Sequence, residues 1–287
     1  MKTSKLLKYN LTAFPRMAQS VQVMDLPKSN LDRRLHFDQV EKLNRKWGCY
    51  LIVAGMRIYY GLPDVKKWLN DAQDVAGEAA ERWLFGNSVQ SHETTVEKMT
   101  TASGWIWKET PLRIDVVGFP FAAAALFDLI VSDTIRPNLR TVIPDTKFSK
   151  DPLNIYHSHN FRDAGLIAIL ETGKKPKEWN AMLSYTTEES GRTLIKDNWN
   201  AYSDIITFTQ KEKWAEALDS LRQAEENFLE RESSGPNPDI DDFMTWECPG
   251  PKQAQQIDLR LTALIRYCFR TNPRVLDEID SVHRWNG

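Results

Sequence analysis

The chain has 287 residues, of which 41% are hydrophobic and 26% charged, and its formal net charge is −2. This composition excludes collagen, disulfide-rich scaffolds and disordered tails, and a chain of this length can bury a substantial core. A net charge near zero argues against a protein whose whole surface binds nucleic acid. The charges are unevenly distributed, because residues 1–150 contain 21 Lys and Arg against 16 Asp and Glu, a difference of +5, whereas residues 151–287 differ by −7.

The cysteines and the hydrophobic runs indicate the compartment. Cys49, Cys248 and Cys268 are widely separated and form no CxxC pair, which argues against a structural zinc site. Unpaired cysteines in apolar helical stretches behave as small hydrophobic residues and are typical of a reducing environment. The N-terminal residues lack an apolar segment of signal-peptide length, and the longest uncharged run, residues 116–127, is too short to span a bilayer. We therefore expect a soluble, cytoplasmic protein with no membrane partner.

Prolines divide the chain. Residues 1–28 are predicted to form an irregular N-terminal arm, because Pro15 and Pro27 interrupt it. The rest, residues 29–287, is predicted to be a single all-helical domain. Three prolines fall between residues 136 and 157, so this stretch reads as a long connection and as the place of a possible subdivision.

The first helical segments have a clear period. Apolar residues recur every three or four positions over residues 30–60 and again over residues 63–85, which indicates two amphipathic helices. Gly61 and Pro63 lie between them, where glycine commonly ends a helix and proline begins one. The two segments are expected to form an antiparallel helical hairpin.

The pattern weakens after residue 87 and then recovers. Residues 92–101 are interpreted as a short helix, and a short strand or hairpin is expected near residues 105–117. Residues 119–131 form an apolar, central helix. Further helices are predicted at residues 160–171, 176–185, 188–207, 211–232, 253–270 and 274–284. The predicted fold class is therefore mostly α, an irregular bundle of about eight to ten helices.

One candidate for metal chemistry lies near the middle of the chain. His157, His159 and Asp163 place two imidazoles and a carboxylate within seven residues, and imidazole nitrogen is a good ligand for zinc, copper or nickel. A third strong ligand and a helical HExxH spacing are missing. Ser158 or Asn160 is an equally good helix cap, so we prefer capping and predict no metal.

A second candidate is an acidic, aromatic segment. It lies between two strong predicted helices and is bounded by Pro and Gly, and its carboxylates lack the glycine and glutamate positions of an EF-hand loop. Carboxylates around aromatic anchors are typical of protein-binding surfaces. The predicted partner-binding residues are Asp239, Asp241, Asp242, Phe243, Trp246 and Glu247.

Catalytic motifs are not found. The sequence has no GxSxG elbow and no phosphate-binding GxxxxGK[ST] loop, and neither Cys49 nor Cys268 has an activating histidine beside it. No zinc finger, RNA-recognition motif or long basic helix points to nucleic acid. We therefore predict a protein that is not an enzyme, has no cofactor and does not bind nucleic acid. The alternatives are a metal-dependent hydrolase using His157, His159 and Asp163, or a helical scaffold or adaptor.

The C-terminal third carries a resemblance to a known group of proteins. A long amphipathic helix opens with Trp214–Leu218 and closes with Phe228–Glu232, and Trp246-Glu247 follows in an acidic linker. Ile257–Leu261 and a closing Val282–Trp285 complete the order. This arrangement resembles the all-helical immunity proteins of bacterial polymorphic toxin systems, in particular immunity family forty-nine.

The resemblance implies an inhibitor. Immunity proteins stay in the producing cell, bind a cognate toxin and occlude its active site, many of them with acidic and aromatic side chains. On this reading the partner is a protein toxin with a basic surface. The C-terminal charge excess of −7 is compatible with such a partner, since charge complementarity speeds association.

Ten tryptophans are an unusual number for this length. Six fall on predicted apolar helix faces, where a large buried ring with a single donor stabilises a core. They are Trp47, Trp68, Trp83, Trp179, Trp199 and Trp214. This leaves Trp246 as the main candidate for a binding surface, with Trp105 and Trp107 in reserve and Trp285 at the C-terminus.

Overall fold

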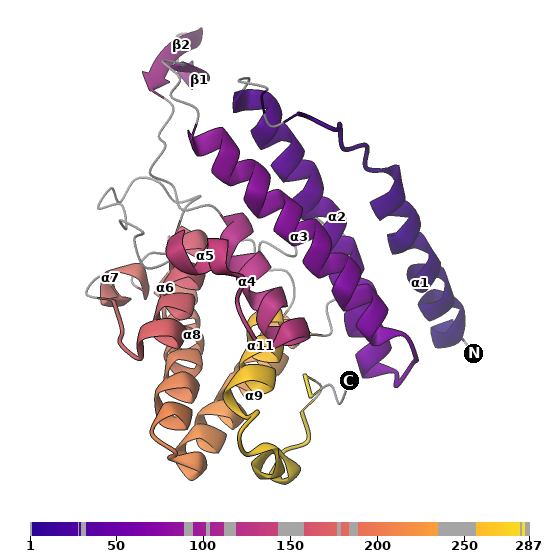
Figure 1. The fold of residues 1–287 in the computed structure, drawn as a ribbon, viewed down its shortest axis with the longest axis vertical. Helices are drawn as coiled ribbons and strands as arrows, with labels where there is room; N and C mark the ends of the chain where they lie inside the picture. Colours follow the sequence, from indigo (N-terminus) through magenta and orange to yellow (C-terminus); the bar gives the residue numbers. More distant parts are fainter. Residues whose placement is uncertain are drawn as a thin grey trace.

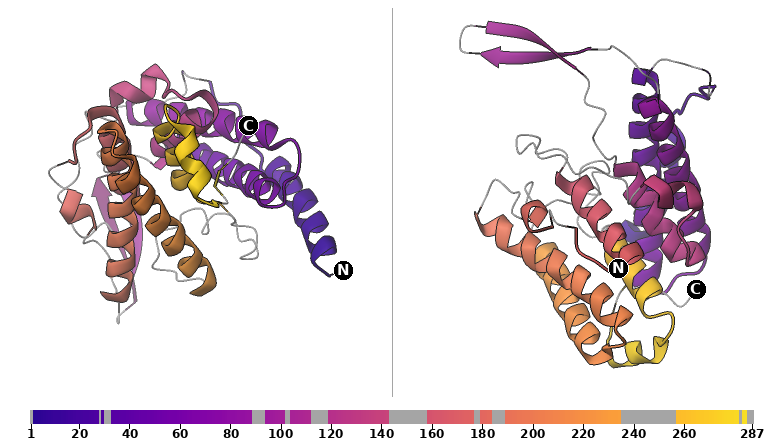
Figure 2. Two further views of the ribbon diagram at one scale, coloured as in Figure 1. Left: turned by 90° about the horizontal axis from the view of Figure 1, so that it is seen from below. Right: turned by 60° about the vertical axis from the view of Figure 1, so that its left-hand side comes forward.

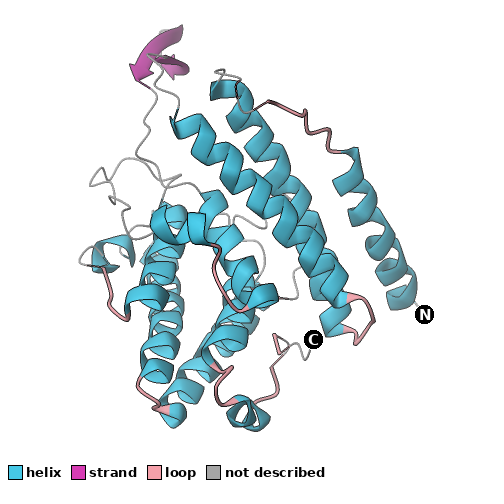
Figure 3. Cartoon of the chain, viewed as in Figure 1, coloured by secondary structure: helices cyan, strands magenta, loops and turns pink. Residues whose placement is uncertain are grey.

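A computed structural model gives the fold. It describes residues 2–27, 29, 33–88, 94–101, 104–111, 119–142, 158–176, 179–183, 189–234, 257–281 and 283–284. The described chain is mostly helical, as predicted, with ten α-helices, one 3-10 helix and a two-stranded hairpin (Figures 1 and 3).

The predicted helical hairpin is confirmed. Helix α2 (Arg33–Tyr59) and helix α3 (Val65–Ser88) run side by side and form the most extensive helix pair of the molecule (Figure 1). Gly61 ends α2 in the left-handed region at a φ of 60°, where glycine has no steric penalty. The small residues Ala72, Ala76 and Ala80, spaced every four positions on α3, are fully buried in the main core.

The irregular conformation predicted for the N-terminal arm is wrong. Helix α1 (Lys2–Ser20) occupies most of it and contains Pro15 in its interior. Phe14 and Ala18 are buried against Cys49, Ile52, Val53 and Met56 of α2, forming a second core cluster separate from the main one. This tertiary contact outweighs the cost of a proline inside the helix, which local sequence reasoning could not weigh.

The middle of the chain forms a hairpin. Strand β1 (Thr94–Thr101) pairs antiparallel with strand β2 (Gly104–Pro111), and Lys98 stands opposite Trp107 in the register. The short helix interpreted at residues 92–101 is therefore wrong, and the hairpin expected near residues 105–117 begins earlier. Four of the eight residues of β1 are threonine and one is valine, and such β-branched residues favour a strand that pairs with a neighbour such as β2. The hairpin points away from the helices (Figure 2).

Helix α4 (Phe119–Ser132) is the predicted central apolar helix, and it packs on α3, on α6 and on α11. A short helix, α5 (Pro137–Val142), follows within the stretch predicted to be a connection, which corrects that prediction. Pro137 is tolerated there because it begins the helix, where an amide donor is not needed.

The second half of the molecule is a group of helices packed beside α4. It contains α6 (Ser158–Thr172), α7 (Trp179–Leu183), α8 (Glu189–Gln210) and α9 (Trp214–Ser234). Helices α8 and α9 form a second antiparallel pair, joined by a tight turn at Glu212 (Figure 2). Gly173 ends α6 at a φ of 70°.

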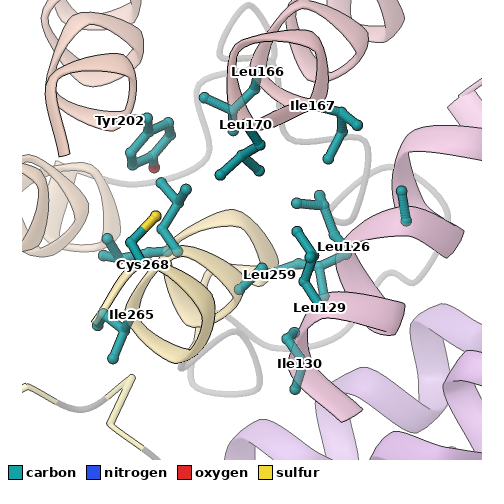
Figure 4. Close-up of a cluster of buried hydrophobic side chains, with 14 of the residues drawn as sticks. Leu126, Leu129, Ile130, Leu166, Ile167, Leu170, Tyr202, Leu259, Ile265 and Cys268 are labelled. Carbon is teal, nitrogen blue, oxygen red and sulfur yellow. The ribbon is translucent and has the colours of Figure 1, made fainter. Parts of the chain in front are cut away.

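Helix α11 (Leu259–Cys268) lies between the two halves, and nearly all of its residues are buried. Figure 4 shows Leu259 and Cys268 of this helix facing side chains from α4, α6 and α8. The chain continues into a 3-10 helix, η3 (Pro273–Glu278), instead of the α-helix predicted at residues 274–284. Six residues with one buried side chain, Leu276, give too little apolar contact for a longer helix.

The tryptophan prediction holds for all six residues assigned to helix faces. Trp47, Trp179 and Trp199 are buried, and Trp68, Trp83 and Trp214 pack partly buried against the main core. The side chains of Trp105, Trp107, Trp246 and Trp285 lie outside the described part. None of the described helices is long and apolar enough to cross a membrane.

Candidate functional site

The predicted partner-binding residues belong to one segment of the chain. Asp239, Asp241, Asp242, Phe243, Trp246 and Glu247 all fall within residues 235–256, which lie outside the described residues. The segment follows α9 and precedes Ile257, and the residues at both of these ends are described. The described geometry is therefore that of two anchors, the groups of side chains that hold the chain before and after this segment.

The first anchor is Asp258, the N-cap of α11. Its side chain accepts hydrogen bonds from the backbone amides of Arg260 at 2.7 Å and Leu261 at 3.0 Å, which satisfies two of the free donors at the helix start. The hydroxyl of Tyr202 donates to the second carboxylate oxygen at 3.2 Å. Asp258 therefore ties the chain that leaves the acidic segment to both α11 and α8.

Aromatic rings surround this anchor. The Arg260 guanidinium is buried, lies 5.0 Å from the centroid of the Trp199 ring and is 4.0 Å from the Asp258 carboxylate. Trp199 stacks edge-to-face on Tyr202 and on Trp179, with ring centroids 5.7 and 6.3 Å apart. A buried charge pair with a cation–π contact contributes little net stability but fixes one geometry.

The second anchor holds the C-terminal residues on α9. The Nδ1 atom of His283 lies 2.9 Å from both carboxylate oxygens of Glu225, and the ring packs edge-to-face on Phe228. The hydroxyl of Ser281 donates to the same carboxylate, and the amide of His283 donates to the Ser281 oxygen at 3.0 Å. The His283 side chain is fully buried.

Ser281, Glu225 and His283 are the residue types of a hydrolase triad, but their arrangement differs. In a triad the serine hydroxyl contacts the imidazole nitrogen opposite the carboxylate. Here the hydroxyl contacts the carboxylate, and Nε2 of His283 is buried without a hydrogen-bond partner. The group therefore attaches the C-terminal residues to α9 and has no activated nucleophile.

The residues considered for metal binding are only partly described. The backbones of His159 and Asp163 lie in α6, one helical turn apart, whereas His157 lies outside the described residues. The side chains of all three residues also lie outside the described part. Across the described ranges, no three or more His, Cys, Asp or Glu side chains gather in a way that could hold a metal ion.

The two described cysteines behave as the sequence predicts. Cys49 and Cys268 are free and buried in helices. Burial raises the pKa of the Cys268 thiol to about 12, and a hydrogen bond with Thr209 only partly opposes this effect. The thiolate is the reactive form, so Cys268 is inert at neutral pH.

Sequence reasoning missed both anchors. A signal existed for Asp258, because an aspartate directly before the apolar run of Leu259 and Leu261 is a typical N-cap. No local signal existed for the pair of Glu225 and His283, whose side chains meet across 58 positions of the chain. Such a pair is created by tertiary packing alone.

Comparisons with known proteins add no relative. No protein-family model, no curated protein and no solved structure matches the chain.

Proposed function

We propose that the chain is an immunity protein that acts in the cytoplasm, where it binds a cognate toxin with a basic surface and occludes the active site of that toxin. The binding surface is the acidic segment 235–256, which supplies the carboxylates of Asp239, Asp241, Asp242 and Glu247 and the aromatic rings of Phe243 and Trp246. The resemblance of the C-terminal third to helical immunity proteins supports the same reading.

The observation that carries the proposal is the attachment of the chain on both sides of this segment. On one side, α9 is fixed by buried Leu221, Ala224 and Phe228 and by the contact of Glu225 with His283. On the other side, Ile257 is buried and Asp258 caps α11. A binding segment held at both ends loses less conformational entropy when it meets a partner than a free tail does.

The distribution of charge supports a basic partner. Net −7 over residues 151–287 favours rapid encounter with a positive surface, and aromatic rings supply the buried contacts that hold the complex. Two buried hydrogen bonds join the supporting elements, one between Tyr202 of α8 and Asp258 before α11, the other between Glu225 of α9 and His283.

Co-expression tests the proposal. The product of the neighbouring reading frame is expressed in a sensitive host, with and without this chain, and growth and binding of the purified proteins are measured. The intact chain should restore growth, and Asp241→Lys with Asp242→Lys should abolish protection. A close charge reversal in a real contact costs about 2–5 kcal/mol of binding free energy.

The matched control reverses two exposed acids on α2, Asp38→Lys with Glu41→Lys, which changes the net charge by the same amount. This variant should protect as well as the intact chain. Protection that survives the segment variant would refute the assigned surface. Absence of any protection by the intact chain would refute the immunity function and favour a scaffold.

A further inference from the structure

Helix α2 contains a buried glycine one turn before its C-terminal end. This residue, Gly55, lies well inside the helix, where every neighbouring residue is also helical. Glycine is less favourable than alanine at such a position, because it loses more backbone freedom on folding. A glycine inside a helix is useful where another part of the chain comes so close that a Cβ atom has no room.

Ile257 comes this close to Gly55. A Cβ atom at position 55 would lie 2.8 Å from Cγ1 of Ile257, 3.5 Å from its Cδ1 and 3.6 Å from its backbone nitrogen. These are the three nearest atoms in the described part of the chain. Real Cβ atoms essentially never approach another heavy atom within 3.0 Å, so an alanine at position 55 would displace Ile257.

A displacement of Ile257 affects the start of α11. Ile257 is buried in the main core, and the next residue, Asp258, is the N-cap that accepts hydrogen bonds from the amides of Arg260 and Leu261. Asp258 also accepts a hydrogen bond from Tyr202 of α8. Because Ile257 and Asp258 are joined by one peptide bond, a shift of the first changes the geometry of the second.

The contact also joins two parts of the molecule that meet mainly through other helices. Among the described elements, α2 has extensive contacts with α1 and α3 alone, whereas α11 packs on α4 and α8. Ile257 is the first described residue after the acidic segment 235–256. Gly55 therefore brings α2 into direct contact with the residue that follows this segment.

We propose that Gly55 is a positioning residue for the toxin-binding segment, because it accommodates Ile257 and so fixes the point at which the acidic segment joins the core. This inference rests on the proposed function. Gly55 is buried and acts through Ile257. A segment whose end is held in one place loses less conformational entropy on binding than a segment whose end moves.

A matched glycine separates positioning from a purely structural role. Gly77 is buried inside the neighbouring helix α3, and a Cβ atom there would meet the side chain of Arg136. Gly77→Ala therefore adds the same methyl group to the same helical hairpin, but against a different side chain. If Gly55 serves only the stability of the hairpin, the two substitutions should have the same effects on the Asp258 cap and on binding.

Amide hydrogen exchange of the full chain tests the contact without a partner. Gly55→Ala should speed exchange at the amides of Arg260 and Leu261 about tenfold or more, since both are held by the Asp258 carboxylate. The amide of His283, which donates to Ser281 at the other anchor, should keep its rate. Gly77→Ala should leave all three rates unchanged.

Three results of this measurement would overturn the positioning role. The first is an unchanged rate at Arg260 and Leu261 in a folded Gly55→Ala variant. The second is an equal increase at His283, which would indicate a general loss of stability. The third is an equal increase in Gly77→Ala.

Ile257→Ala tests the same contact from the other side and leaves α2 unaltered. It removes Cγ1 and Cδ1, so it should also speed exchange at the amides of Arg260 and Leu261. In this background Gly55→Ala should bring no further increase, because the atoms that it would meet are gone. A further increase of the same size would show that the glycine acts at another contact and would contradict the proposal.

Binding of the product of the neighbouring reading frame, measured by isothermal titration calorimetry, tests the link to function. Gly55→Ala should weaken the affinity about tenfold or more, whereas Gly77→Ala should leave it unchanged. Unchanged affinity in a Gly55→Ala variant with faster amide exchange would overturn the role of Gly55 in binding. Absence of binding by the intact chain would refute the immunity function itself, whereas the exchange rates would still decide whether Gly55 holds Ile257.

Discussion

At the scale of single residues, the buried carboxylate of Asp128 in α4 joins this helix to α3 and to Arg136. Asp128 is buried in α4 and accepts two hydrogen bonds from the side chain of Arg136, at 2.8 and 2.7 Å, and one from Gln73 of α3 at 2.8 Å. The hydrogen bonds that its guanidinium donates to Asp128 raise the pKa of Arg136. The fork also needs room, because a Cβ atom on Gly77 would lie 2.0 Å from the Arg136 side chain.

Gly77→Ala is expected to destabilise the protein although alanine is the better helix former. The added methyl group displaces the Arg136 guanidinium from Asp128 at a cost of about 1–3 kcal/mol, and the gain in helix propensity of about 1 kcal/mol reduces the net loss to at most about 2 kcal/mol. Urea unfolding followed by circular dichroism measures the difference.

The same substitution in an Arg136→Ala background should have the opposite sign. Once the guanidinium is gone, the methyl group meets no crowded side chain, and only the gain in helix propensity of Gly77→Ala remains, about 1 kcal/mol. If Gly77→Ala destabilises both backgrounds equally, Arg136 is not the reason for the glycine.

At the scale of elements, α1 is the helix that depends most on one neighbour. Pro15 removes an amide donor inside it, and Phe14 supplies its main buried contact with α2. Phe14→Ala should therefore open α1 locally, with a loss of about 3 kcal/mol, whereas Pro15→Ala should stabilise it by restoring a hydrogen bond to the carbonyl of Leu11.

Hydrogen exchange separates the two effects on α1. Amides of residues 2–20 should exchange faster in Phe14→Ala and slower in Pro15→Ala, while amides of α11 keep their protection. Equal loss of protection in α11 and α1 would mean that α1 belongs to the same cooperative unit as the main core.

Apolar periodicity predicted the long amphipathic helices and failed for elements that depend on contacts distant in sequence. The periodic apolar stripes that became α2, α3 and α9 are long, so their burial was visible locally. The helix over α1 depends on a cluster formed with α2, and η3 is too short to bury an apolar face. Such elements are decided by contacts distant in sequence, which no local pattern contains.

At the scale of the whole molecule, one core joins the two halves. Leu69 of α3, Leu129 of α4, Ile167 of α6 and Leu264 of α11 belong to a single buried cluster. The prediction that residues 29–287 form one domain can be tested by calorimetry.

A single unfolding transition is expected, with equal calorimetric and van't Hoff enthalpies. Leu129→Ala, at the centre of the core, should lower the midpoint of the whole transition without splitting it, at a cost of about 2–5 kcal/mol. Two separate transitions would instead support a subdivision near residues 136–157.

The composition of the candidate site could be predicted from the sequence, but the two anchors that hold it could not. Carboxylates and aromatic rings between residues 239 and 247 are visible in the sequence, because composition needs no partner to be read. The anchors on either side, Asp258 with Tyr202 and Glu225 with His283, join positions more than fifty residues apart. Their pairing follows from the packing of α8, α9 and α11.

The sequence alone determined the near-neutral composition, the opposite charges of its two halves and the periodic stripes that specify a mostly helical fold, since these are properties of residue type and spacing. The tertiary structure decided the rest. It made α1 a helix and gave the buried carboxylate of Asp128 its partner, Arg136. Charge counted along the sequence predicts only a partner of opposite sign, because the place of each charge on the surface depends on how the helices pack.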